Sequence, residues 1–92
     1  MGFSPIGRAH EDVEAGRFNL DGEQPVNTDG GLKSYGHPLS ASGLRMMYEI
    51  YKQLQGKAGP RQIKNPKLGL AHNLGGVTAY FNVGIAILGA RD

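Results

Sequence analysis

Residues 27–43 read Asn-Thr-Asp-Gly-Gly-Leu-Lys-Ser-Tyr-Gly-His-Pro-Leu-Ser-Ala-Ser-Gly, and the rest of the chain is arranged around this stretch. Its glycines stand at positions 30, 31, 36 and 43, on both sides of His37 and Pro38. Glycine is costly inside an ordinary helix or strand, so this density predicts a special backbone path. Proline fixes its own φ and moves the residue before it away from the helical region. We therefore expect a stiff loop that presents His37 at the start of a helix.

A second histidine, His72, lies in the segment Leu68-Gly-Leu-Ala-His-Asn-Leu-Gly-Gly76. Histidine transfers protons near neutral pH, and the glycines after His72 leave backbone N–H groups free for a developing oxyanion. Each histidine also has a purely structural interpretation: His37 would bond a carbonyl in a tight turn, and His72 would end a buried strand. Two such loops in one small chain favour function, and we expect them to meet. The third histidine, His10, lies in an acidic region and is interpreted as solvated.

The composition limits the classes of function. Ninety-two residues make one small domain or part of a larger one. The net charge is only +2, and the basic residues are interleaved with acids, which argues against nucleic acid as a partner. The chain has no cysteine, so it has no disulfide framework, no zinc–thiolate site and no thiol nucleophile. Two histidines without acidic residues at ligand spacing predict no metal site, and the glycine pairs match no nucleotide-binding loop, so no motif binds a cofactor.

The start of the chain, Met-Gly-Phe-Ser-Pro, has neither a basic region nor a long apolar run, and predicts no signal peptide. The longest apolar stretch, from Val77 to Leu88, is too short and too interrupted to span a membrane. We expect a cytoplasmic protein.

The helix is predicted over Ser42–Gln55, where apolar residues recur at helical spacing and also spread beyond one face. A helix this apolar should be buried on more than one side. Ser40 or Ser42 is expected to cap its start, and Gly56 to end it.

Short strands are predicted on either side of a turn. Residues 67–72 and 77–88 are apolar enough on both faces to be covered from both sides, and the loop between them, Asn73–Gly76, suggests a hairpin. A short extended piece, Gln24–Asn27, precedes the helix, and residues 1–26 read as an irregular lead-in with one or two helical turns near His10–Gly16. A chain this short cannot cover such elements on all sides, so it associates with itself or a partner, or belongs to a larger domain.

Residues 27–43 closely resemble the Gly-His-Pro signature of thiolases, Asn-x-x-Gly-Gly followed by Gly-His-Pro-x-Gly-Ala-Ser/Thr-Gly. Residues 68–76 resemble the His-Asn-x-Gly-Gly form of the last thiolase motif, which is typical of the sterol-carrier-protein-x and archaeal branch. The resemblance runs from Phe3 to the C-terminus and corresponds to about the last quarter of a thiolase. It implies an α/β fold: residues 1–92 would be the end of a thiolase C-terminal domain, a strand–helix–strand–strand fragment with a buried helix and a terminal hairpin.

The resemblance also implies roles for individual residues. His37 matches the histidine that activates the nucleophilic cysteine and helps to hold the thioester oxygen. His72 matches the acid/base that moves a proton at the substrate α-carbon or the leaving thiol. The amide of Leu74, beside Gly75, matches an oxyanion-hole donor. The substrate of the full enzyme would be an acyl-coenzyme A thioester.

This chain departs from the family pattern in three ways. Ser40 replaces a glycine after His-Pro-x, Thr78 replaces another after Gly75-Gly76, and the nucleophilic cysteine is missing. Two interpretations of function stay open. The chain is a fragment or split subunit of an acyl-CoA acyltransferase that is inactive alone and needs the N-terminal thiolase half or a partner chain in a homo- or hetero-oligomer. Alternatively, it is a non-catalytic assembly module that keeps the thiolase shape.

Overall fold

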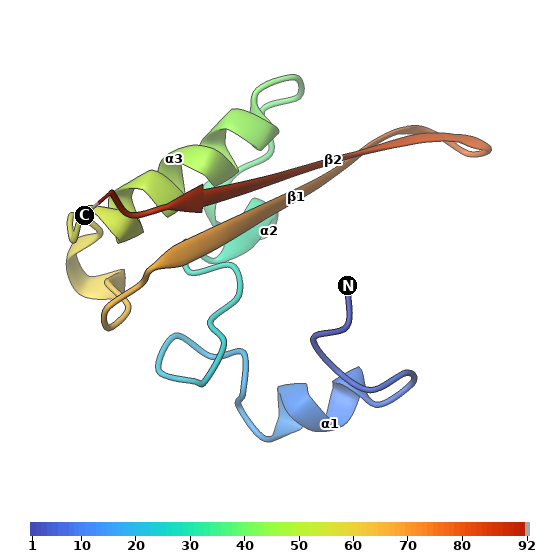
Figure 1. Ribbon diagram of the computed structural model, residues 1–92. Coiled ribbons are helices and arrows are strands. Elements are labelled where there is room, and N and C mark those ends of the chain that lie inside the picture. The colour runs from blue at the N-terminus through green and yellow to red at the C-terminus, as the bar shows by residue number, and fades with distance from the viewer. Residues whose placement is uncertain (92) are drawn as a thin grey trace.

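The computed structural model describes residues 1–91 and joins three α-helices, a 3-10 turn and one β-hairpin (Figure 1). In chain order the elements are α1 (Ala9–Glu14), α2 (Gly31–Tyr35), α3 (Ser42–Leu54), η1 (Gly59–Arg61), β1 (Leu68–Val77) and β2 (Tyr80–Gly89). The predicted helix and hairpin are both present. The extended piece at residues 24–27 forms no strand, and the short helix α2 occupies part of the stretch interpreted as loop.

Helix α3 packs along the hairpin through two reciprocal glycine contacts. A Cβ on Gly69 of β1 would collide with the side chain of Ile50, and a Cβ on Gly43 of α3 would lie 3.1 Å from Nδ2 of Asn73. The missing side chains therefore let helix and strand approach closely at both ends of the contact. Because Gly43 meets Asn73 and Ile50 meets Gly69, α3 runs antiparallel to β1, and the turn of the hairpin projects beyond the helix (Figure 1).

The hairpin turn lies later in the sequence than predicted. β1 and β2 are antiparallel with Val77 opposite Tyr80, so Thr78 and Ala79 form a two-residue turn. Residues 73–76, which we expected to be the turn, belong to β1 instead and pair with residues 81–84. Ala79 has φ 71°, the left-handed backbone that such turns require and that favours glycine or asparagine. The glycine pair was therefore a misleading turn signal.

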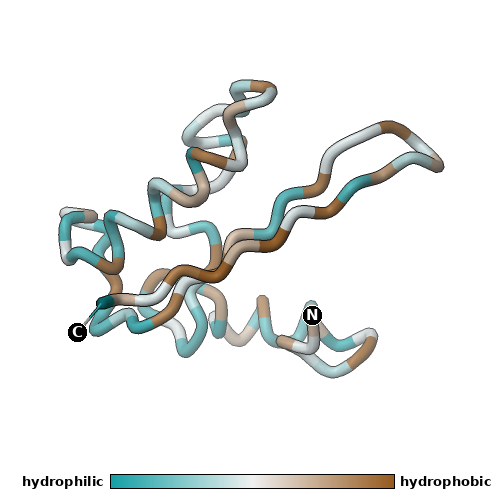
Figure 2. Tube along the Cα trace, turned by 45° about the horizontal axis from the view of Figure 1, so that its top comes forward, coloured by the Kyte–Doolittle hydropathy of each residue, from teal (hydrophilic) through white to brown (hydrophobic). Residues whose placement is uncertain are grey.

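The fully buried residues of α3 are polar, whereas part of its apolar surface is exposed. Its buried residues are Ser42, Glu49 and Gln53. By contrast, Leu44 is 70% exposed and Tyr51 50% exposed. The predicted burial on several sides is therefore not reached within this chain, as its length led us to expect. Figure 2 shows apolar residues along both strands of the hairpin as well, where nearly every large side chain is exposed.

A hydrogen-bond network around Glu49 folds two loops onto α3. The Glu49 carboxylate accepts bonds from Thr28 Oγ1 (2.9 Å) and Gln53 Nε2 (3.0 Å), and the Arg61 guanidinium binds both of its oxygens. Gln53 also bonds the backbone carbonyl of Arg61 (2.8 Å) and the amide of Ile63 (2.9 Å). Satisfied partners are what allow a carboxylate to be buried. This network holds the start of the 27–43 stretch and the segment after α3 in place.

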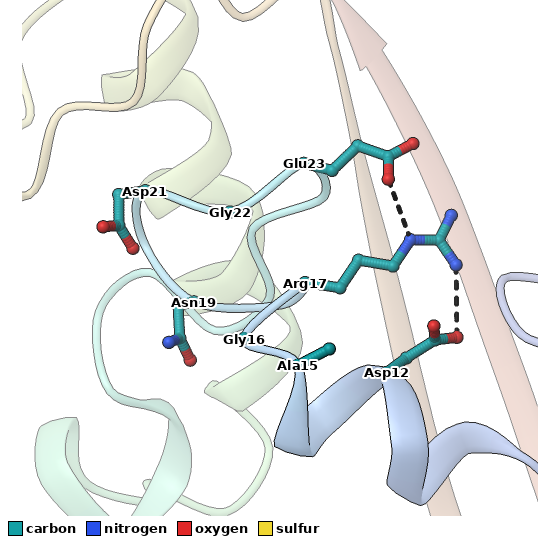
Figure 3. A pocket seen from close by; sticks show the side chains of 8 residues that line it. All are labelled: Asp12, Ala15, Gly16, Arg17, Asn19, Asp21, Gly22 and Glu23. Carbon is teal, nitrogen blue, oxygen red and sulfur yellow. Dashed lines mark hydrogen bonds and ion pairs between the residues drawn. The ribbon is translucent and has the colours of Figure 1, made fainter.

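The lead-in is organised by one arginine. Arg17 lies between two acids, with Nη1 3.2 Å from Asp12 Oδ2 and Nε 3.3 Å from Glu23 Oε2 (Figure 3). Its Nη1 also donates to the carbonyl of Phe3 (2.6 Å). The helical turns that we predicted near residues 10–16 form α1, which has no buried residue. The lead-in is thus held by local polar contacts rather than by a core.

We predict that Glu49→Gln lowers the free energy of unfolding by about 1–3 kcal/mol, because it removes the counter-charge of a half-buried guanidinium. Urea unfolding followed by circular dichroism measures the change. Glu14→Gln on the exposed α1 is the matched control and should shift stability by less than about 0.5 kcal/mol. Equal losses in the two variants would contradict the role of Glu49.

The same carboxylate predicts a pH dependence. Burial raises the pKa of Glu49, but hydrogen bonds from Arg61, Gln53 and Thr28 outweigh it and hold the pKa below its ordinary value of 4.5. A folded-state pKa below the unfolded one gives stability that is complete above pH 4.5 and is lost as the pH falls through the folded pKa. Unfolding at a series of pH values from 7 down to 3 should therefore show a steeper acid loss for the wild type than for Glu49→Gln. Parallel curves would count against this assignment.

Candidate active site

The loop that carries His37 is fixed at its base by a buried ion pair. Asp29 accepts a hydrogen bond from the amide of Gly31 (2.8 Å) and pairs with Arg45 of α3. The two side chains are 6% and 10% exposed, so the pair is shielded from water. The Arg45 guanidinium also lies 5.4 Å from the ring centre of Tyr35 at the end of α2. Helix α2 is therefore held against α3, and the chain that follows it starts from a fixed point.

Two glycines with left-handed φ bound α2. Gly30, before the helix, has φ 86°, and Gly36, after it, has φ 96°. Gly36 turns the chain into His37 and Pro38, so the predicted special backbone path is confirmed at these positions. Ser40, two residues after Pro38, has φ 68°. A non-glycine residue there is strained, and this is the position at which the resemblance led us to expect glycine.

The His37 ring contacts the hydroxyl of Ser42, the first residue of α3. Its Nδ1 lies 2.5 Å from the hydroxyl oxygen of Ser42, and that hydroxyl also donates to the carbonyl of Pro38 (3.1 Å). Ser42 is buried, whereas His37 is exposed. We expected Ser40 or Ser42 to cap the helix, but the residue at the cap position is Ala41, with no side-chain cap hydrogen bond. The Ser42 hydroxyl holds the histidine loop instead.

The two histidine motifs meet through their neighbours. Gly43, next to Ser42, touches the side chain of Asn73, which is next to His72. Within residues 1–91 no hydrogen bond joins the two imidazole rings. The segments that carry both histidines are thus adjacent, and the contact runs through Asn73, to which sequence reasoning gave no role. Its position directly after His72 was the only signal.

His72 lies on the face of β1 that points away from α3. Side chains alternate along a strand. Gly69 and Asn73 both contact α3, and Ala71 between them is buried, so the odd-numbered residues face the helix. His72 is exposed on the opposite face, where its cross-strand partner is Ile85. His72 therefore lies on the opposite face of β1 from Asn73, so the two loops that we expected to meet do so through Asn73 and not through the His72 ring. The apolar side chains around His72 are left uncovered by the described residues.

The N–H of Leu74 points away from the hairpin, whereas that of Gly75 is used within it. In an antiparallel pair, hydrogen-bonded and non-hydrogen-bonded positions alternate. The amide of Ala90 donates to the carbonyl of Lys67 (3.0 Å), so position 67 and every second residue after it face β2. Gly75 belongs to that set, opposite Asn82, and Leu74 does not. The Leu74 amide is thus directed to the outer edge of β1, as an oxyanion donor would need to be.

Other parts of the described chain offer less chemistry. No group of three or more histidine, cysteine or acidic residues within positions 1–91 could hold a metal ion. A shallow hollow lies in the lead-in between α1 and the chain around Arg17 and Glu23, and neither His37 nor His72 lines it (Figure 3). None of the helices formed by residues 1–91 has the length and apolar character needed to cross a membrane.

Comparison with known proteins agrees with these motifs. Residues 1–90 match the family described as thiolase C-terminal domain-like. The chain is 43% identical over 76 residues to an acetyl-CoA acetyltransferase of Methanothermobacter thermautotrophicus, covering 83% of this chain and 20% of that protein. It is 43% identical over 75 residues to human sterol carrier protein 2, covering 82% and 14%. It is 36% identical over 88 residues to non-specific lipid-transfer protein-like 2 of Caenorhabditis elegans, covering 91% and 21%. The chain thus spans about a fifth or less of these relatives.

The placement of Asn73 and His72 predicts a selective cross-link. A Cβ at position 43 would lie 3.7 Å from Asn73 Cγ, the atom whose place a cysteine sulfur at position 73 would take, so thiols at the two positions lie within reach of each other. The double variant Gly43→Cys/Asn73→Cys should therefore form an intramolecular disulfide on mild oxidation, because the chain has no other cysteine. Mass spectrometry of a proteolytic digest identifies the bond.

The matched control is Gly43→Cys/His72→Cys, which moves the thiol by one residue to the other face of β1. It should stay reduced under the same conditions. A disulfide formed as readily by the control pair would overturn the assignment of His72 to the face away from α3.

Proposed function

The chain belongs to the thiolase C-terminal domain-like family, and we propose that it supplies two proton-transfer groups and an oxyanion donor to an acyl-CoA acyltransferase. The reaction would be thioester Claisen condensation or its reverse, thiolytic cleavage. The groups are His37, His72 and the amide of Leu74. The observation that carries the proposal is the contact between the two motifs: the segment that holds His37 touches the residue after His72.

His37 would act as the base for a cysteine supplied by other sequence. Its ring is exposed on a loop fixed by Ser42 and Pro38, so it is open to a partner group from outside the chain. In this step the proton moves from sulfur to imidazole, and the thiolate attacks the thioester carbonyl. The carbon–sulfur bond to coenzyme A then breaks, the acyl group stays on the cysteine, and coenzyme A leaves as its thiol after taking up a proton. Removing the thiol proton is needed because the thiolate, not the thiol, is the nucleophile.

His72 and Leu74 would serve the second half of the chemistry. Condensation needs a base that takes a proton from the α-carbon of a thioester and a donor that stabilises the resulting enolate oxygen. The Leu74 N–H points out of the hairpin edge, where a thioester oxygen can approach it. Because His72 is on the face of β1 away from α3, the substrate would reach it from the uncovered apolar side of the hairpin.

This activity requires a second polypeptide segment. The chain contains no cysteine and corresponds to only 14–21% of the length of the relatives above. The uncovered surface fits that requirement, because the open face of the hairpin carries Leu70, Leu74, Val83, Ile85 and Ile87, which are 38–66% exposed. Contiguous exposed apolar side chains mark interaction surfaces. We therefore infer that the chain by itself has no acyltransferase activity.

The same surface favours a second candidate function. If the open faces of α3 and the hairpin serve only to bind another thiolase-like chain, the protein would be a non-catalytic assembly module. Both functions predict association. They differ in whether the histidines matter once the complex has formed.

We predict that the chain alone does not cleave acetoacetyl-CoA in the presence of coenzyme A. Adding a separately produced N-terminal part of a thiolase, with its nucleophilic cysteine, should give turnover, measured by the loss of acetoacetyl-CoA absorbance. In that complex, His37→Ala and His72→Ala should each lower kcat by about 10²–10⁴-fold, the usual contribution of a general acid or base. His10→Ala, in the exposed lead-in helix, is the control and should leave kcat unchanged.

Three results would count against the enzyme proposal in different ways. Turnover by the chain alone would refute its inactivity. Full activity of the complex with His37→Ala would refute the role of that residue. Stable association, measured by sedimentation, without any turnover would favour the assembly module.

A further inference from the structure

The Ser42 hydroxyl has two partners but only one proton, and this limits the state of His37. Its oxygen is 2.5 Å from His37 Nδ1 and 3.1 Å from the carbonyl oxygen of Pro38. A carbonyl oxygen accepts hydrogen bonds and never donates them. The Ser42 proton must therefore point at Pro38 if that contact is a hydrogen bond.

With its proton used in this way, Ser42 offers only a lone pair to the imidazole. His37 Nδ1 must then carry a hydrogen and donate it. The opposite arrangement, with Nδ1 unprotonated, would leave one of the two short contacts as a pair of facing lone pairs. Only the form with hydrogen on Nδ1 satisfies both contacts.

Because Ser42 is buried, its hydroxyl depends on these two protein partners for hydrogen bonds. Ser42 is 4% exposed, so water has little access to replace a missing partner of its hydroxyl. The Pro38 carbonyl is fixed in turn, since it also accepts a hydrogen bond from the amide of Ala41 (2.9 Å). Pro38 has a fixed φ and Ser42 is the first residue of α3, so the acceptor and the hydroxyl are both held by rigid backbone.

We propose that Ser42 is a positioning residue that holds neutral His37 in the Nδ1–H tautomer and leaves the lone pair on Nε2. Nε2 is then the atom that accepts a proton, and protonation there gives an imidazolium that still donates from Nδ1 to Ser42. In the complex described under the proposed function, on which only this last role rests, Nε2 would take the thiol proton of the cysteine. The tautomer itself does not depend on that function.

Nitrogen NMR of the uniformly ¹⁵N-labelled chain tests the proposal directly. At a pH where the histidines are neutral, His37 should show a pyrrole-type shift at Nδ1 and a pyridine-type shift at Nε2. His10 serves as an internal reference for a solvated ring. A pyridine-type shift at Nδ1 of wild-type His37 would overturn the proposal without any variant.

Two substitutions distinguish an effect of Ser42 on the His37 tautomer from an effect on the fold of the chain. Ser42→Ala should return the His37 shifts to the tautomer mixture of His10, and Ser42→Thr, which keeps the hydroxyl, should restore the wild-type pattern. Unchanged amide shifts of β1 and β2 identify a folded variant. If Ser42→Ala stays folded and leaves the His37 shifts as in the wild type, Ser42 does not set the tautomer.

The reconstituted complex gives an independent readout. Ser42→Ala should lower kcat by about 10–100-fold, as loss of a group that orients a reactive histidine does, with little change in the KM for acetoacetyl-CoA, and Ser42→Thr should recover most of it. If the complex is inactive but the NMR shifts are as expected, the proposed function fails and the tautomer assignment stands. If the complex is active but the shifts show the hydrogen on Nε2, the tautomer assignment fails and the proposed function stands.

Discussion

Close contact between α3 and β1 is the constraint on which the rest of the structure depends. A glycine on each element receives a side chain from the other: Gly69 receives Ile50, and Gly43 receives Asn73. Interlocking of this kind fixes both the distance and the register of the two elements. It also sets the relation between the two histidine segments, because Gly43 follows Ser42 and Asn73 follows His72. The geometry of the candidate site is thus a consequence of how a helix packs on a strand.

The burial of side chains in this chain is unusual, because several polar side chains are buried and many large apolar ones are exposed. The buried side of α3 carries Ser42, Glu49 and Gln53, whose polar atoms are satisfied by the loops before and after the helix. Leu44, Tyr48 and Tyr51 of α3 and most of the apolar side chains of the hairpin are exposed. A hydrophobic core stabilises a folded domain, and only Ala58 and Ala71 are buried apolar residues among those described. The internal contacts therefore specify the shape, while most of the large apolar surface of the hairpin faces outward.

Much of the fold could be predicted from the sequence, since strong periodicity defines the long helix and the second strand. The turn could not, because the glycine pair at 75–76 looks like a turn and Thr78-Ala79 does not, yet the latter forms it. That error matters for the site, since the position of the turn decides which amides point outward and which residues face α3. The identity of His37 as a loop histidine followed from Gly36 and Pro38. The role of Ser42 needed coordinates, because a serine at a helix start is usually a cap.

The outward-pointing edge of β1 has a consequence for the isolated chain. From Leu68 to Val77 this strand contains no charged residue and no proline, the gatekeepers with which natural proteins protect exposed edges. Its free amides and carbonyls, beside an apolar face, form a template on which a strand from another molecule can add. An uncovered edge of this kind favours strand addition between copies of the chain, and a segment that covered it would remove the template.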